Sequence, residues 1–175
     1  RQMPTSGIFM ESPVSRHTAL KLLFICTHNR CRSILAEAIT NQFGAGRLVA
    51  KSAGSQPADR VHPLSLKYLA EAEISAEGLC SQSWDDYESW QPDVVITVCD
   101  SAAAEPCPLW FGQSCRVHWG LADPSRLDAN QEDIATAFLH TIDLLKHRVL
   151  SLLDHDLNDL NAGDLEDLLK KIAAK

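Results

Sequence analysis

The sequence predicts an α/β fold, a doubly wound, four-stranded parallel sheet flanked by helices. Short apolar runs alternate along the chain with segments whose apolar residues recur at helical spacing, which is typical of such a sheet. The run Asp93-Val-Val-Ile-Thr-Val-Cys99 is apolar almost throughout, as expected of a parallel strand buried on both faces. A length of 175 residues favours one domain with a sizeable core.

The first half of the chain predicts two strands, each followed by a helix. Residues 20–26 and 48–50 are short apolar runs typical of strands. Between them, apolar residues recur at helical spacing from Ser33 until two glycines end the helix. Pro63 suits the first position of a second helix, because a proline there gives up no helical hydrogen bond.

The second half predicts further strands and helices, followed by a helical tail. We expect a short helix over residues 83–90, strands over 93–99 and 115–119, and a long amphipathic helix over 134–153. A last helix, capped by Asp164, follows them. We therefore expect a flexible N-terminal tail over residues 1–19, one domain over 20–153 and a C-terminal helical extension over 154–175.

The charge and the apolar content of the sequence argue against two classes of binding partner, nucleic acids and membranes. A net charge of −7 and a pI of about 5.4 argue against extended contact with nucleic acid. No run approaches the roughly 20 apolar residues of a membrane span. We expect a cytoplasmic monomer that does not bind membranes.

Six cysteines occur at positions 26, 31, 80, 99, 107 and 115. In a cytoplasmic chain this number indicates metal or redox chemistry rather than a disulfide framework. No pair has the C-x2-C or H-x3-H spacing of a structural zinc site, so we expect no bound metal.

A candidate oxyanion site follows the first strand. Cys26 ends this strand, and Arg32 and Ser33 open the next helix six and seven residues later. Successive backbone N–H groups and a helix N-terminus attract an anion, and they also favour a thiolate. The Arg32 guanidinium can donate two parallel hydrogen bonds to a tetrahedral anion, and the Ser33 hydroxyl can donate a hydrogen bond to the thiolate. The expected substrate-binding residues are Thr27, His28, Asn29, Arg30, Cys31, Arg32 and Ser33.

This pattern resembles a known family. Cys26-x5-Arg32-Ser33 is similar to the phosphate loop of low-molecular-weight protein tyrosine phosphatases, and the closer resemblance, over about residues 20–153, is to arsenate reductases built on that fold. The run from Val98 to Pro108 looks like the redox segment of those reductases, with thiols at Cys99 and Cys107.

A second resemblance lies further along the chain. The run from His118 to Pro124 is similar to the family's acid loop, with Asp123 as its carboxyl group. Ser125 follows where the phosphatases commonly carry a tyrosine, which favours the reductase.

The resemblance implies a thiol relay. Cys26 would attack arsenate while Arg32 binds it and Asp123 protonates the leaving oxygen. Cys99 would then attack Cys26, and Cys107 would take over the disulfide for reduction by thioredoxin, with glutaredoxin as the other possible reductant. No bound cofactor is expected.

Two alternatives remain open at this point. A phosphatase would share Cys26, Arg32 and Asp123 but would need neither Cys99 nor Cys107. A non-catalytic redox or oxyanion sensor would form the disulfide without turnover. We expect Cys80 and Cys115 to be buried structural thiols, since free cysteine is usually buried. For Cys31, packing and a backup thiol both remain possible.

Overall fold

The computed structural model describes residues 18–106, 108, 112 and 114–174, and among these residues four parallel strands form one sheet. The strand order is β2-β1-β3-β4, with the bounds β1 (Leu20–Ile25), β2 (Leu48–Ala53), β3 (Val94–Thr97) and β4 (Cys115–His118). The predicted doubly wound parallel sheet is therefore confirmed. β1 and β3 are central and largely buried, which explains their nearly continuous apolar sequences.

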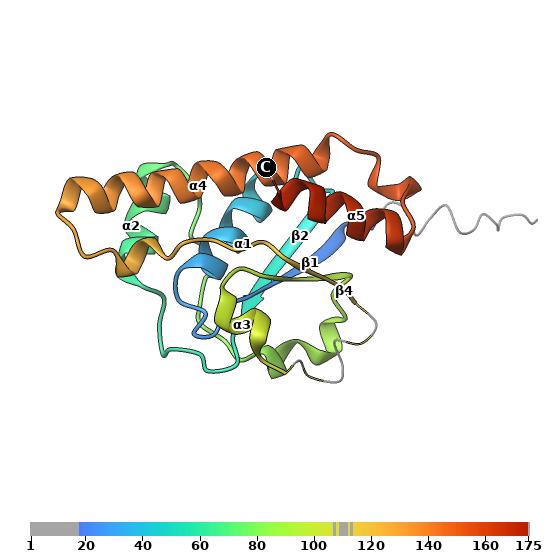
Figure 1. Ribbon diagram of the computed structural model, residues 1–175, viewed down its shortest axis with the longest axis horizontal. Helices are drawn as coiled ribbons and strands as arrows, with labels where there is room; N and C mark the ends of the chain where they lie inside the picture. The colour runs from blue at the N-terminus through green and yellow to red at the C-terminus, as the bar shows by residue number, and fades with distance from the viewer. Residues whose placement is uncertain (1–17, 107, 109–111, 113, 175) are drawn as a thin grey trace, which may run out of the picture.

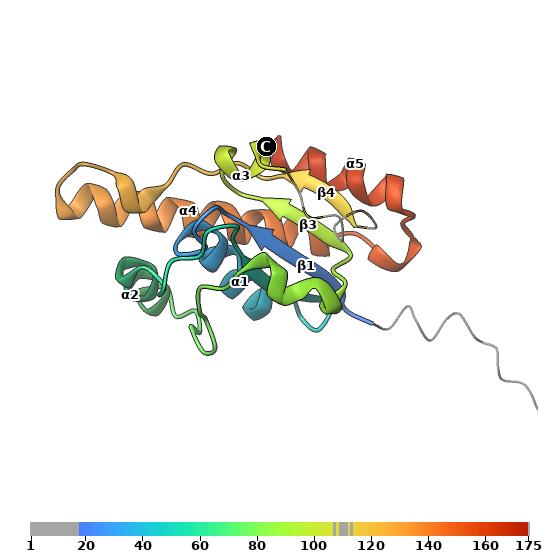
Figure 2. The same cartoon turned by 90° about the horizontal axis from the view of Figure 1, so that it is seen from below.

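Helices cover the two faces of the sheet unequally (Figures 1 and 2). Figure 2 shows α1 (Arg32–Phe43) and α4 (Gln131–Leu153) behind the sheet and the 3₁₀ helix η3 (Trp84–Trp90) in front of it. The remaining helical elements are α2 (Pro63–Glu71), α3 (Asp100–Ala104), η5 (Pro124–Arg126), η6 (Leu157–Asp159) and α5 (Ala162–Ala173). Within the described residues, no helix is long and apolar enough to cross a membrane.

The strand order places a topological switch point between β1 and β3. The chain leaves β1 for β2 on one side, and it later returns to pair β3 on the other side of β1. In parallel α/β sheets, ligands bind beyond the carboxyl ends of the strands at such a point. Here the loop after β1 and the helix α3 after β3 lie at that point.

The C-terminal helix α5 packs on the domain. Leu169 and Ile172 of α5 are buried in the main core, and the indole N–H of the fully buried Trp119 donates to the Leu169 carbonyl at 3.0 Å. The Arg148 guanidinium of α4 lies 5.7 Å from the Trp119 ring centroid and donates to the Ala173 carbonyl. The spacing of apolar residues in this helix is compatible with packing on the domain or on a partner, and in the structure the helix packs on the domain.

Several elements differ from the expected ones. The second strand runs on to Ala53 rather than ending at residue 50, and α4 begins at Gln131 rather than at Ile134. Residues 100–104, where no helix was expected, form α3, because alanine has the highest helix propensity and Asp100 is favourable in a first turn. The last helix begins at Ala162 rather than after Asp164. The Asn161 side chain caps it by accepting from the Asp164 N–H at 2.8 Å.

We predict that Leu169→Ala lowers the free energy of unfolding by about 2–5 kcal/mol, because it leaves a cavity where α5 meets the core. Leu66→Ala, on the exposed face of α2, is the matched control and should cost well under about 1 kcal/mol. Urea unfolding of both variants provides the measurement. Equal, small losses would show that α5 is not part of the cooperative fold.

Candidate active site

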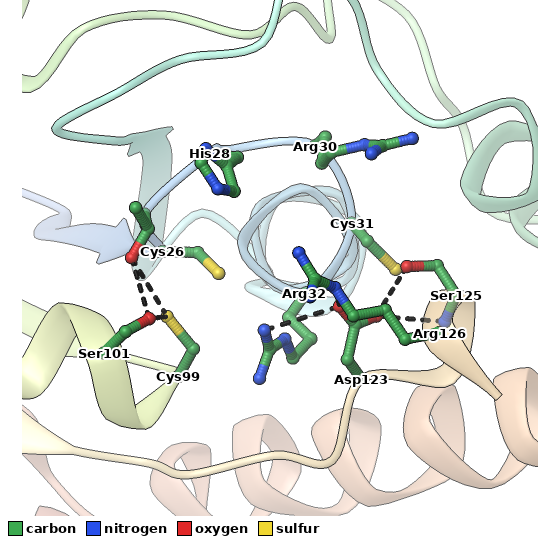
Figure 3. Close-up of a pocket in the computed structure, with 11 residues that line it drawn as sticks. Cys26, His28, Arg30, Cys31, Arg32, Cys99, Ser101, Asp123, Ser125 and Arg126 are labelled. Carbon is green, nitrogen blue, oxygen red and sulfur yellow. Dashed lines mark hydrogen bonds and ion pairs between the residues drawn. The ribbon is translucent and has the colours of Figure 1, made fainter.

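A cavity of about 170 Å³ opens at the carboxyl ends of β1, β3 and β4 (Figure 3). Its walls come from the loop after β1, from the start of α3 and from the segment after β4. The lining residues are Cys26, Thr27, His28, Arg30, Cys31, Arg32, Cys99, Ser101, Asp123, Ser125 and Arg126. The structure therefore brings together four of the five predicted catalytic residues, while Cys107 lies outside the described residues.

The loop from Cys26 to Ser33 directs its carbonyl groups away from the cavity. The carbonyls of Thr27, His28 and Arg30 each accept a backbone hydrogen bond of 2.9 Å, and the three donors are the N–H groups of Gln56, Ala58 and His62 on the surrounding chain. In a trans peptide the N–H group points opposite to the carbonyl. The N–H groups of the residues that follow therefore face the cavity, which makes a nest for an anion.

A buried amide holds this loop in shape. Asn29 is fully buried with a φ of +47°, a left-handed conformation that asparagine tolerates better than most residues. Its side-chain N–H₂ donates to Ser33 and Ser52 at 2.8 and 2.9 Å, and its oxygen accepts from the Gln82 N–H at 2.8 Å. The side chains of Asn29 and Ser33, expected to bind substrate, thus lie behind the loop and support it.

Gly54 allows β2 to end directly against this loop. A Cβ atom at Gly54 would meet the carbonyl oxygens of both Thr27 and Cys26, the latter at 2.6 Å. No side chain fits into that space without moving the backbone. The Gly54 N–H also donates to the Gln82 carbonyl at 2.9 Å, which joins the loop to the segment before η3.

The thiols of Cys26 and Cys99 lie close together in the cavity, and both residues are almost fully buried. The neighbouring Cys99 thiol and burial raise the pKa of Cys26, against the opposing effects of Arg32 and of the Thr27 N–H. Interaction with the Cys26 thiol lowers the pKa of Cys99 to about 4. The two thiols therefore titrate as a coupled pair.

Hydroxyl groups surround the sulfur of Cys99. The Ser101 hydroxyl lies 3.5 Å from Cys99 Sγ and the Thr27 hydroxyl 3.8 Å from it, and both hydroxyls are 2.9 Å apart. The Ser101 hydroxyl and backbone N–H groups of Thr27 and Ala102 add to the lowering of the Cys99 pKa. Such donors stabilise a thiolate more than a thiol.

Arg32 and Asp123 lie side by side in the cavity wall and form an ion pair (Figure 3). Arg32 Nη2 lies 3.5 Å from Asp123 Oδ2, and Arg32 Nη1 donates to the Leu121 carbonyl at 2.9 Å. The Nε of Arg32 is buried and has no hydrogen-bond partner among the described residues. Asp123 is held in turn by the N–H and hydroxyl of Ser125 at 2.9 and 2.6 Å.

The other expected substrate-binding residues take different places. His28 lines the cavity, and its Nδ1 lies 3.0 Å from the Gln56 carbonyl. Arg30 stands exposed at the rim. Cys31 lines the cavity as a buried thiol, and burial raises its pKa to about 11, which keeps it protonated at neutral pH.

Three further residues line the cavity that were not among the expected site residues, namely Ser101, Ser125 and Arg126. Arg126 Nε lies 3.5 Å from Asp123 Oδ2, so it adds a second cation beside the carboxylate. Each of the three lies within three residues of a predicted catalytic residue, and this closeness in sequence is the feature by which they could have been predicted.

Two cysteines differ from the expectation of buried structural thiols. Cys80 is exposed, because it lies in the loop between α2 and η3 rather than under a helix, and Cys115 is half-buried at the start of β4. Among the described residues, no three His, Cys, Asp or Glu side chains are grouped so that they could hold a metal ion.

Comparisons with known proteins agree with this geometry. The family model for low molecular weight phosphotyrosine protein phosphatase matches residues 21–163. The arsenate reductase of Bacillus subtilis is 30% identical over 128 residues, which cover 73% of this chain and 91% of that protein. The glutaredoxin arsenate reductase of a Synechocystis species is 34% identical over 104 residues, which cover 59% of this chain and 78% of that protein.

Solved structures support the same relationship. An arsenate reductase in a phosphate-binding state has a TM-score of 0.63 and 30% identity, covering 77% of this chain and 97% of its own. A thioredoxin-dependent arsenate reductase of Corynebacterium glutamicum has a TM-score of 0.58 and 25% identity, covering 78% of this chain and 61% of its own. The chain therefore belongs to the low molecular weight phosphotyrosine protein phosphatase family, and within it is related to the arsenate reductases.

Proposed function

We propose that this protein reduces arsenate to arsenite through a relay of Cys26, Cys99 and Cys107, which an external thiol protein resets. The observation that carries the proposal is the pair of neighbouring thiols, Cys26 and Cys99, in a cavity that is also lined by arginines. A phosphatase needs one nucleophilic thiol in this cavity, whereas a two-electron reduction needs a second thiol beside it.

The first step forms a bond between Cys26 Sγ and arsenic. The dianion enters the nest of loop N–H groups, and Arg32 turns its unpartnered Nε towards it. The Cys26 proton moves onto Cys99, so that Cys26 attacks as the thiolate. Asp123, in its protonated form, donates its proton to the departing hydroxyl group of the arsenate, which leaves as water.

The second step transfers two electrons to arsenic. Cys99, after losing its proton, attacks Cys26 Sγ, and the sulfur–arsenic bond breaks with its electron pair going to arsenic. Arsenite leaves and a Cys26–Cys99 disulfide remains. Cys107 then attacks Cys99, which frees Cys26 and moves the disulfide to Cys99–Cys107. The relay is intramolecular and requires no second copy of the chain.

We propose thioredoxin as the protein that reduces the final disulfide, and the thioredoxin-dependent relative of Corynebacterium glutamicum supports this choice. The relative named glutaredoxin arsenate reductase makes glutaredoxin the alternative. Reduction by either protein requires a reducing compartment, so we place the reaction in the cytoplasm.

We expect the wild type to sustain arsenate-dependent NADPH oxidation with thioredoxin and thioredoxin reductase, and Cys26→Ser to abolish it because the first bond cannot form. Cys107→Ser should complete one turnover and then stop as the Cys26–Cys99 disulfide. Cys80→Ser, which removes an exposed thiol outside the cavity, is the matched control and should remain active. Repeated turnover by Cys107→Ser would contradict the relay, and aryl phosphate hydrolysis without arsenate turnover would indicate a phosphatase.

We also expect the thiol pair to react as a thiolate in acid. Because the pKa of Cys99 is lowered to about 4, its charge persists above that pH and is lost as the pH falls through it. Labelling of the pair by iodoacetamide should therefore continue at pH 6, resolved residue by residue by mass spectrometry. The urea-denatured chain is the control, since free cysteines with a pKa near 8.5 label slowly there. Equal slowing in folded and denatured protein would contradict the lowered pKa of Cys99.

A further inference from the structure

Glu105 reaches from the end of α3 back to the active-site loop. Its Oε1 accepts a hydrogen bond from the Thr27 hydroxyl at 3.4 Å, and its Oε2 accepts one from the Ser55 hydroxyl at 2.5 Å. Thr27 follows Cys26 directly, and Ser55 lies just beyond β2. One half-buried carboxylate therefore joins three segments that are far apart in the sequence.

These contacts matter because α3 is short. It has five residues, with Cys99 at its N-cap and Glu105 at its C-cap. A helix of this length is not stable by itself in water and depends on tertiary contacts. Cys99 lies at one end of α3, just after β3 and beside Cys26, and Glu105 holds the other end.

The Thr27 hydroxyl connects Glu105 to the chemistry. This hydroxyl lies within 3.8 Å of Cys99 Sγ, 2.9 Å of the Ser101 hydroxyl and 3.4 Å of Glu105. A hydroxyl has a single proton to donate. The position of Glu105 therefore helps to decide how the hydroxyl beside the Cys99 thiolate is oriented.

We propose that Glu105 is a positioning residue that holds α3, and with it Cys99, against the active-site loop so that Cys99 can reach the sulfur of Cys26. The proposal deepens the reductase proposed above and rests on it for its role in turnover. Glu105 touches neither substrate nor reacting sulfur, and it acts through Thr27, Ser55 and α3. Its removal shifts α3 towards arrangements in which the two sulfurs are apart, which disfavours the Cys26–Cys99 disulfide.

The test is the equilibrium of that disulfide in full-length Cys107→Ser protein, held in mixtures of reduced and oxidised dithiothreitol. Cys26 and Cys99 lose two protons and two electrons, and the oxidised dithiol gains them. Mass spectrometry after alkylation measures the fraction of linked Cys26 and Cys99. Glu105→Ala should lower the equilibrium constant for this disulfide roughly tenfold, the effect of one lost hydrogen bond to a charged group.

Further variants separate positioning from general destabilisation. Glu105→Gln keeps one acceptor and the side-chain length, so it should fall between the wild type and Glu105→Ala. Ser55→Ala should lower the equilibrium constant less than Glu105→Ala does. The double variant should have the same constant as Glu105→Ala alone, because Ser55 acts through its hydrogen bond to Glu105. Glu71→Ala removes an exposed carboxylate at the end of α2 and should change nothing. The unfolding temperature should stay within a few degrees in all of them.

A disulfide equilibrium in Glu105→Ala equal to that of Glu71→Ala would overturn the proposal, as would independent, additive effects of Ser55→Ala and Glu105→Ala. The assay uses no arsenate, so its result is distinct from the test of the reductase. If the wild type fails to reduce arsenate but Glu105→Ala still weakens the disulfide, the positioning role stands and the proposed reaction falls.

Discussion

The parallel, in-register pairing of β1 with β3 is the constraint on which the rest of the site depends. Ile25 pairs with Thr97, and the Val98 N–H donates to the Ile25 carbonyl at 2.9 Å, so both strands end at the same level of the sheet. Cys26 and Cys99 follow these ends. A shift of one residue would turn β3's side chains to the opposite faces, and a shift of two would move Cys99 by roughly 6.6 Å along the strand. Either shift would separate the thiols.

The electrostatics of the site follow from that placement. The protein carries a net charge of −7, yet the cavity gathers Arg30, Arg32 and Arg126 around a loop whose N–H groups face inward. This local field can hold both an oxyanion and the charge of the thiol pair. Asp123 is the one carboxylate that lines the cavity among the described residues, and two arginines and Ser125 hold it. Glu105 lies beyond the lining and orients the segment that carries Cys99.

Most of the fold and much of the site could be predicted from the sequence, and the exceptions have physical causes. The strand before Cys26, the helix after it and the strand before Cys99 carry strong apolar patterns, and all three lie where expected. Residues 100–104 were missed as a helix because five residues are too few for a periodic pattern. Substrate binding by Asn29 and Ser33 stays a prediction, and only the structure shows that their side chains lie behind the loop, because side-chain direction follows from the backbone conformation, here the positive φ of Asn29. Cys80 was expected to be buried because free cysteines usually are, and only packing shows that it is exposed.

What the sequence determined by itself is the set of reactive groups and their place at the ends of elements. These features are local, since a thiol, a guanidinium and a helix start lie within eight consecutive residues. The tertiary structure alone decided that Cys26 and Cys99, 73 positions apart, line one cavity as neighbours, and that Glu105 reaches Thr27 from 78 positions away. Such contacts depend on strand register and on how the loops pack beyond the sheet, and neither can be predicted from a short segment of the sequence.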